Sequence, residues 1–429
     1  MQESVAVFLL IGLFAVMIIC HLPVTFAMVI ATATTMLYLN IPMMTMVQQM
    51  AKSVNSFSLL AIPFFILMGE IMGAGGISDR LLKFANVLVG RFRGGLAFVN
   101  VLASMFFGGI SGSAVADVSS LGKIEIPMME DAGYDKDFSI CVTVSSACQG
   151  LLIPPSHNMV LYAMTAGGVS VGKLFLAGYA PGILLGVALM ALCYIFAIKR
   201  NDPKGDPVSF KEALVITKDA VFAIGAMFII VGGVVAGLFT ATEAAAIGCI
   251  YCLLVATLVY RQLSLKDMGR ILYNTVKTLA MIYSLIAAAG AFAWMMAYLR
   301  IPAKFTGILM DVSDNKIVVL LLINVLLLLL GCIMDMAPLI LIMTPILLPV
   351  VQKFGMDPVQ FGIMLIANLA IGLLTPPVGS CLYAGCAVGG AKIEKVTKCM
   401  LPFYLTMVIV LLMITFIPAL SMTLPNLMM

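Results

Sequence analysis

The chain has 429 residues, of which 62% are hydrophobic and only 10% are charged. Soluble domains usually carry about 25% charged residues, so this composition excludes an ordinary soluble protein. The net charge of +4 is small and is spread over short loops, which argues against a nucleic-acid partner. The sequence therefore predicts an all-α polytopic membrane protein.

Apolar runs follow one another along nearly the whole chain, and a helix needs about 20 such residues to cross roughly 30 Å of hydrocarbon. The runs lie near 4–20, 24–40, 57–74, 96–110, 171–198, 219–239, 244–260, 275–297, 317–334 and 400–423. Basic residues gather at 199–218 and 261–270, which the positive-inside rule places in the cytoplasm. Counting spans back from these loops puts the N-terminus outside. The first run lacks a basic segment and a cleavage site, so we expect a retained span and no signal peptide.

Two apolar stretches are interrupted by the same motif, Gly-Leu-Leu-x-Pro-Pro, at 150–155 and 372–377. A proline pair removes two backbone donors and cannot continue a helix. At membrane depth, unpaired backbone is tolerated only where it is buried in protein or lines a watery cavity. We therefore predict two broken helices, near 139–165 and 359–388, and interrupted helices in both halves of a polytopic chain point to a transport site.

The two motifs belong to a longer internal repeat, because Pro154 and Pro376 lie 222 positions apart (376 − 154). The same offset aligns Pro127 with Pro349, Gly133 with Gly355 and Asp135 with Asp357. Interrupted apolar segments precede both motifs and predict re-entrant hairpins near 96–125 and 317–350. The predicted repeats are 1–200 and 219–429, joined by a cytoplasmic linker at 201–218. We expect inverted repeats, with parallel repeats as the alternative.

Candidate ion ligands gather where hairpin tips should meet the breaks. Helix ends and unwound carbonyls bind small cations, and hydroxyl oxygens suit a hard cation such as Na⁺. The first candidate site places Ser111, Gly112, Ser113 and Asp117 opposite the break from Pro154 to Asn158. The second places Met334, Asp335, Met336, Ala337 and Pro338 opposite Thr375, Pro376, Pro377 and Gly379. The alternatives are close helix packing through Ser-Gly-Ser and an N-cap at Asp335.

Other polar residues in apolar segments are weaker candidates. Glu243 fits a capping box with Thr240. Glu70 is equally consistent with a packing role and with an ion or substrate path. The cysteines sit mostly inside apolar runs and are read as buried thiols. No nucleophile elbow, phosphate loop or His-Glu-x-x-His motif is present, so we expect no enzyme and no primary pump.

Several motifs together resemble the large membrane subunit (M subunit, DctM-like) of TRAP transporters, the tripartite ATP-independent periplasmic family. They are Ser58-Leu-Leu-Ala-Ile-Pro-Phe-Phe65, Ser111-Gly-Ser-Ala-Val-Ala-Asp117, Ile153-Pro-Pro-Ser156, Gly237-Leu-Phe-Thr-Ala-Thr-Glu243 and Gly372-Leu-Leu-Thr-Pro-Pro377. The resemblance implies an elevator-type transporter in the bacterial inner membrane. It implies symport of two or more Na⁺ ions with an organic acid, such as a sugar acid, sialic acid or C4-dicarboxylate.

The resemblance also implies partners and residue roles. A periplasmic binding protein should deliver the substrate, and a small DctQ-like membrane subunit is expected as a separate chain, because this sequence begins almost directly with its first span. The hairpin tip and the first break should form one sodium site, and Asp335 with Thr375 the other. Ser113, Asp117 and Ser156 should face the substrate. His157 and Asn158 stand where many members have small apolar residues, which suits a hydroxyl-rich acid.

Two other kinds of function remain open from the sequence. A stand-alone sodium-coupled dicarboxylate symporter of elevator type would share the same broken helices. The other is a channel or a membrane-embedded enzyme, which would be a different class of membrane protein.

Overall fold

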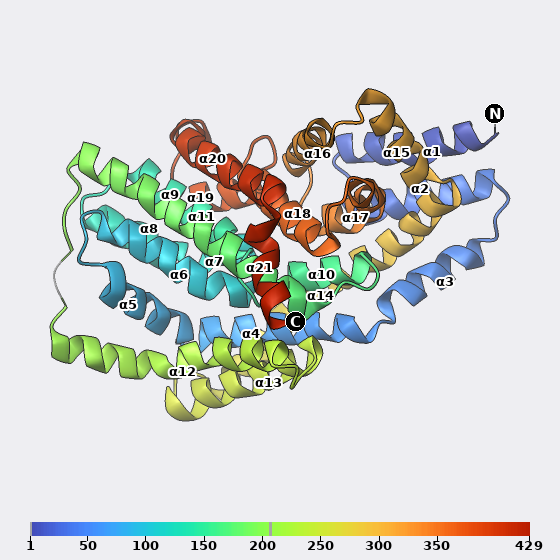
Figure 1. The fold of residues 1–429 in the computed structure, drawn as a ribbon. Coiled ribbons are helices and arrows are strands. Elements are labelled where there is room, and N and C mark those ends of the chain that lie inside the picture. Colours follow the sequence, from blue (N-terminus) through green and yellow to red (C-terminus); the bar gives the residue numbers. More distant parts are fainter. Residues whose placement is uncertain (1, 206–207) are drawn as a thin grey trace.

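The computed structural model describes residues 2–205 and 208–429, apart from the side chains of Gln2, Ser58, 109–111, Leu265 and Leu309. All regular elements in this part are helices (Figure 1). They are α1 (Gln2–Ile19), α2 (Val24–Tyr38), α3 (Met43–Val54), η1 (Phe57–Leu60), α4 (Ala61–Ala74), α5 (Ile77–Val89), α6 (Gly95–Ser111), α7 (Ala114–Ser120), α8 (Gly122–Asp131), α9 (Lys136–Gly150), α10 (His157–Thr165), α11 (Val171–Arg200), α12 (Phe210–Val235), α13 (Ala241–Leu254), η2 (Val255–Val259), α14 (Leu265–Tyr298), α15 (Ile301–Val312), α16 (Lys316–Gly331), α17 (Met336–Lys353), α18 (Pro358–Gly372), α19 (Ser380–Gly389), α20 (Ile393–Phe416) and α21 (Pro418–Met428).

Six helices in the described residues are long and apolar enough to cross a membrane, or up to seven if α4 and α5 count as one bent span. The prediction of an all-α polytopic chain is confirmed. The described cysteines are free thiols and most are buried, as predicted. Residues 210–218, predicted as part of the linker, instead form the start of α12. Ser209 and Glu212 close a capping box there, and this charged first turn hides the helix from a hydropathy argument.

The repeated Gly-x-Asp motif ends one helix and begins the next. Gly133 (φ 89°) and Gly355 (φ 72°) adopt the left-handed conformation that glycine tolerates, just after α8 and α17. Asp135 then caps α9 and Asp357 caps α18, each accepting a hydrogen bond from a backbone N–H of the first turn (2.9 and 2.7 Å). The shared spacing therefore encodes the same sharp turn in both halves.

Both Pro-Pro motifs break a helix where predicted. α9 ends at Gly150 and α18 at Gly372, so the helices that precede the breaks end 222 positions apart, and they begin 222 positions apart as well. The Pro154–Pro155 and Pro376–Pro377 peptide bonds are both cis. The chain resumes as α10 and α19. The halves differ elsewhere: α3, η1 and α4 span 43–74, whereas the segment 222 positions later, 265–296, lies within the single helix α14.

The helices after the two breaks are exchanged between the halves. α10 packs against α17 and α18, while α19 packs against α7, α8 and α9. In Figure 1, α10 accordingly lies beside the orange helices of the second half. The Tyr162 hydroxyl donates a hydrogen bond to the Pro358 carbonyl (2.6 Å), and a Cβ at Gly362 would lie 2.4 Å from the Tyr162 ring. Both breaks are thereby held in one core.

Glycine pairs let the helix before each break approach its neighbour closely. A Cβ at Gly108 of α6 would lie 2.5 Å from the Cα of Gly150 of α9. In the second half, a Cβ at Gly372 of α18 would lie 2.6 Å from the Cα of Gly331 of α16. Small residues at such crossings are the usual device for close helix packing in membranes. Close helix packing, the alternative role for Ser-Gly-Ser, is therefore present at glycine pairs near the two tips.

Buried polar side chains reinforce the same two crossings. Ser146 donates a hydrogen bond to the Oδ1 atom of Asn100 (2.7 Å), joining α9 to α6. Asn368, 222 positions after Ser146, donates to the Oδ1 atom of Asn324 (3.0 Å), joining α18 to α16. All four residues are buried, and buried polar groups need such partners. The contacts fix α9 against α6 and α18 against α16.

Replacing Gly108 with Ala should destabilise the protein by about 1–3 kcal/mol, the usual range for overpacking. The added Cβ would meet backbone atoms of α9, which cannot rotate away. Thermal unfolding of the purified protein in detergent measures this. Gly307→Ala in α15 is the control, because no atom of the described residues lies within 4 Å of its Cβ position. Equal losses of melting temperature in both variants would contradict the packing argument.

Candidate transport site

The tip of the first helix pair, Gly112 and Ser113 between α6 and α7, lies against the first break. Gly112 ends α6 with a φ of 65°, and its carbonyl accepts a hydrogen bond from the Asn158 side-chain amide (3.0 Å). A Cβ at Gly112 would lie 2.2 Å from the Nδ1 atom of His157. Ser113 caps α7. The predicted approach of this tip to the break is therefore present, while the Ser111 side chain lies outside the described residues.

The first break is enclosed by protein up to Ser156. Residues 151–156 are buried, including Pro154. Glycines on α11 make room for it, since a Cβ at Gly178 would lie 2.4 Å from the Leu152 carbonyl oxygen and one at Gly182 would lie 2.7 Å from the Ile153 side chain. This enclosure satisfies the condition under which unwound backbone persists at membrane depth.

Polar side chains are buried beside this break. Ser156 is fully buried at the N-terminus of α10, and its hydroxyl has no hydrogen-bond partner in the described structure. Asp117 is 1% exposed and Asn158 is 4% exposed. A buried hydroxyl without a hydrogen-bond partner is rare and requires an explanation. A bound ion that contacts the hydroxyl oxygen would be such an explanation.

The tip of the second helix pair meets the second break in a related way. The Val378 backbone N–H donates a hydrogen bond to the Cys332 carbonyl (3.0 Å). Asp335 is exposed and accepts a hydrogen bond from the backbone N–H of Met336 (2.9 Å), so it caps α17. The cap alternative is confirmed. Ion binding by Asp335 stays a prediction, and a carboxylate that caps a helix has further acceptor positions for an ion.

The remaining predicted ligands of the second site surround the same turn. Thr375 is half-buried and donates its hydroxyl hydrogen to the Ile371 carbonyl (2.9 Å). Gly379 is buried close to Thr375, since a Cβ there would lie 3.1 Å from the Thr375 carbonyl oxygen. Met334 is buried, and Ala337 and Pro376 are half-buried.

Equivalent carbonyls in the two breaks have different neighbours. Leu152 and Leu374 are 222 positions apart, and so are Gly182 and Tyr404. In the first half the Leu152 carbonyl packs against the glycine face of α11. In the second half the Tyr404 hydroxyl of α20 donates a hydrogen bond to the Leu374 carbonyl (2.5 Å). The sequence offset alone did not reveal this hydroxyl, because it depends on how α20 packs.

A cavity of about 630 Å³ opens between the first tip and helices α4 and α14. Its polar lining includes Glu70, Ser113, Lys123, His157, Arg270 and Asn274. Asn274 donates a hydrogen bond to the Glu70 carboxylate (3.2 Å). Of the predicted substrate residues, Ser113 and His157 line the cavity. Asp117, Ser156 and Asn158 are buried and do not line this cavity, so their contact with substrate stays a prediction.

Sequence reasoning missed the cations of this cavity. The sequence predicts Arg270 only as part of a basic loop, although Arg270 and Asn274 are four residues apart and share one face of α14. Lys123 follows the first tip on α8. Glu125 was missed as well: it is fully buried, and neither carboxylate oxygen has a hydrogen-bond partner in the described structure. The predicted capping box of Thr240 and Glu243 is confirmed at the start of α13.

Comparison with known proteins identifies the family. The chain matches the tripartite ATP-independent periplasmic transporter DctM component over residues 11–420. It is 39% identical to the sialic acid TRAP transporter large permease protein SiaM of Vibrio cholerae, over 89% of each chain. It is also 39% identical to the isethionate TRAP transporter permease protein DctMQ of Oleidesulfovibrio alaskensis, over 96% of this chain and 65% of that one. The fold is similar to that of the Alcanivorax borkumensis YdaH transporter (TM-score 0.61, 16% identity, 88% of this chain and 89% of that one). The chain therefore belongs to the DctM family, the large permease subunits of TRAP transporters, and it is a transport protein and not an enzyme.

Proposed function

We propose that this permease takes up an organic acid together with sodium across the bacterial inner membrane. The observation that carries the proposal is the cavity at the first tip, where Ser113 and His157 share a lining with Lys123 and Arg270. Its volume of about 630 Å³ lies within the range typical of small-molecule sites. Lys123 and Arg270 outnumber the one carboxylate of this lining, Glu70, so an anionic substrate would balance the remaining positive charge.

The substrate class follows from the groups in the cavity. A guanidinium fork binds carboxylate or sulfonate oxygens, while Ser113 and Asn274 offer hydrogen bonds to hydroxyl groups. Relatives transport sialic acid and isethionate according to their names, and both compounds are hydroxylated organic acids. We therefore propose a hydroxylated acid such as a sugar acid, with a C4-dicarboxylate as the second candidate.

Sodium is proposed to bind where each tip meets its break. The first site would use carbonyls of the turn at Pro154, of Gly112 and the hydroxyl of Ser156, whose buried oxygen has no other partner in the described structure. The second would use Asp335, Thr375 and carbonyls near Gly379. Both sets consist of oxygen donors, which hard cations prefer.

The packing suits an elevator mechanism, in which one compact unit moves. The exchanged helices α10 and α19 tie both breaks and both helix pairs together, so these elements would move as a single body. A periplasmic binding protein is proposed to deliver the substrate. A small membrane subunit is proposed as a separate chain. The longer isethionate relative makes a fused arrangement the other possibility.

Reconstitution into liposomes tests the coupling. With the binding protein and its small subunit present, an inward sodium gradient should drive uptake, and removal of either the gradient or the binding protein should abolish it. Radiolabelled substrate reports the uptake. Uptake that persists without the binding protein would favour the stand-alone symporter, and flux independent of any gradient would contradict both.

Asp335→Asn should separate capping from ion binding. Asparagine caps helices as well as aspartate does, so the variant should melt like the wild type in the absence of sodium. Loss of the charge should raise the half-saturating sodium concentration for uptake about tenfold, equivalent to about 1.4 kcal/mol. Asp335→Ala should lose both the cap and the ion response. An unchanged sodium dependence in the asparagine variant removes this residue from the ion site.

Arg270→Gln and Lys123→Gln should raise the substrate concentration needed for half-maximal uptake about tenfold or more, because each removes a charge-assisted hydrogen bond of roughly 1.5–3 kcal/mol. Their sodium dependence should stay unchanged. Lys277→Gln is the matched control on α14, since that exposed lysine does not line the cavity. The substrate assignment fails if the cavity variants and the control behave alike.

A further inference from the structure

Helix α5 links the α4 segment to the first helix pair and lies at a steep angle to α4. The bend between them is 71°. One face of α5 is buried through Ile77, Leu81, Leu82 and Ala85, and the other carries Arg80 and Lys83. A short amphipathic helix with basic residues on its polar face is typical of an element that lies in the membrane interface.

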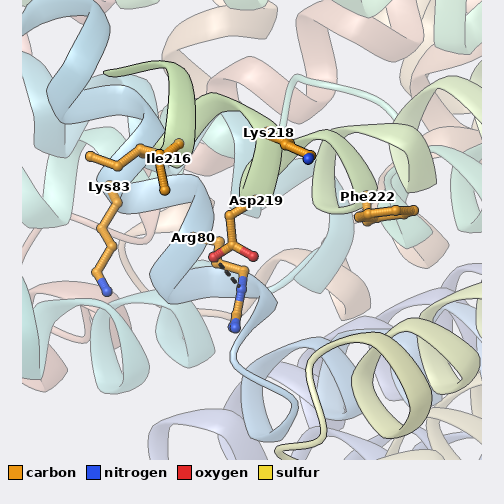
Figure 2. A pocket seen from close by; sticks show the side chains of 7 residues that line it. Arg80, Lys83, Ile216, Lys218, Asp219 and Phe222 are labelled. Atoms are coloured by element: carbon orange, nitrogen blue, oxygen red, sulfur yellow. Dashed lines mark hydrogen bonds and ion pairs between the residues drawn. The ribbon is translucent and has the colours of Figure 1, made fainter. Parts of the chain in front are cut away.

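A groove of about 490 Å³ runs between α5 and α12 (Figure 2). At its centre the Arg80 guanidinium pairs with the Asp219 carboxylate (2.9 Å). Arg80 also stacks 3.6 Å from the Tyr260 ring centroid and donates a hydrogen bond to the Gly76 carbonyl (2.8 Å). Arg80 is therefore fixed by the protein and lines the groove.

Two lysines flank that ion pair. Figure 2 shows Lys83 on one side of the Arg80–Asp219 pair and Lys218 on the other. Both lysines are exposed, and no ion pair or hydrogen bond among the described residues includes either side chain. With three cations and one carboxylate, the groove has an excess of positive charge that its own residues do not neutralise.

The rest of the groove is apolar and faces outward. Val215 is 68% exposed and Phe222 is 43% exposed, and both lie on α12, which is long and apolar enough to span a membrane. Ile216 lies beside them. The loop that precedes α12 belongs to the segment that the positive-inside rule places in the cytoplasm, where the leaflet carries anionic lipids.

We infer that this groove binds one anionic phospholipid of the cytoplasmic leaflet. Lys83 and Lys218 hold the phosphate-containing headgroup, and the acyl chains lie along Val215 and Phe222. A free phosphate would use the lysines but would leave the apolar wall uncovered, so the groove fits a lipid better. Because α5 connects α4 to the helix pair that carries the first tip, a bound lipid would hold that connection against α12.

Native mass spectrometry of the purified protein tests the inference. Delipidated protein is supplied with phosphatidylglycerol or phosphatidylcholine of equal chain length. The wild type should bind phosphatidylglycerol about tenfold more tightly, which is the scale expected for basic residues near anionic headgroups. Lys83→Gln combined with Lys218→Gln should abolish the preference for phosphatidylglycerol. Lys83→Arg combined with Lys218→Arg keeps both positive charges and should therefore keep the preference.

Lys266→Gln is the control. This exposed lysine lies at the start of α14, within the other basic segment at 261–270, and it does not line the groove. It should keep the wild-type preference. An unaltered preference in the glutamine double variant would overturn the proposal. Displacement of the lipid by millimolar inorganic phosphate would also overturn it, since the site would then recognise a free anion. Melting temperatures of all variants confirm that each is folded.

Discussion

A proline pair in the middle of an apolar helix leaves backbone carbonyls without partners, in a medium that offers no water to replace them. This constraint operates twice in the chain, and much of the surrounding structure encloses these carbonyls or hydrogen-bonds to them. The glycines of α11 close over the first break, and the Tyr404 hydroxyl of α20 reaches the second. The exchanged helices α10 and α19 then place each break inside a core built by both halves.

The same constraint gives the breaks their chemistry. A helix that stops and resumes presents carbonyls at one end and N–H groups at the other, so a polar site forms with few ionisable residues. The two copies then diverge. The first is enclosed up to Ser156 and lies next to a cavity lined by Lys123, Arg270 and Glu70, whereas the second exposes Pro377 and Val378. This asymmetry supports the proposal that one site binds ions alone and the other is shared with substrate.

Much of this arrangement could be read from the sequence, because it depends on local rules. The Gly-x-Asp turns and the Pro-Pro breaks occur where glycine conformation, aspartate capping and proline geometry demand them. The approach of Gly112 to Asn158 followed from the repeat. Lys123 and Arg270 could not be assigned to one cavity, since they meet only through the packing of α8 and α14. The start of α12 was missed because its first turn is charged.

Each break and its facing tip are proposed to bind sodium together. The most direct measurement is a pair of high-resolution cryo-electron microscopy maps of the same complex, one in sodium and one in choline. We expect added density in sodium at two places, between Gly112 and the turn at Pro154, and between Asp335 and Thr375. Identical maps at both places, or sodium-dependent density only elsewhere, would contradict it.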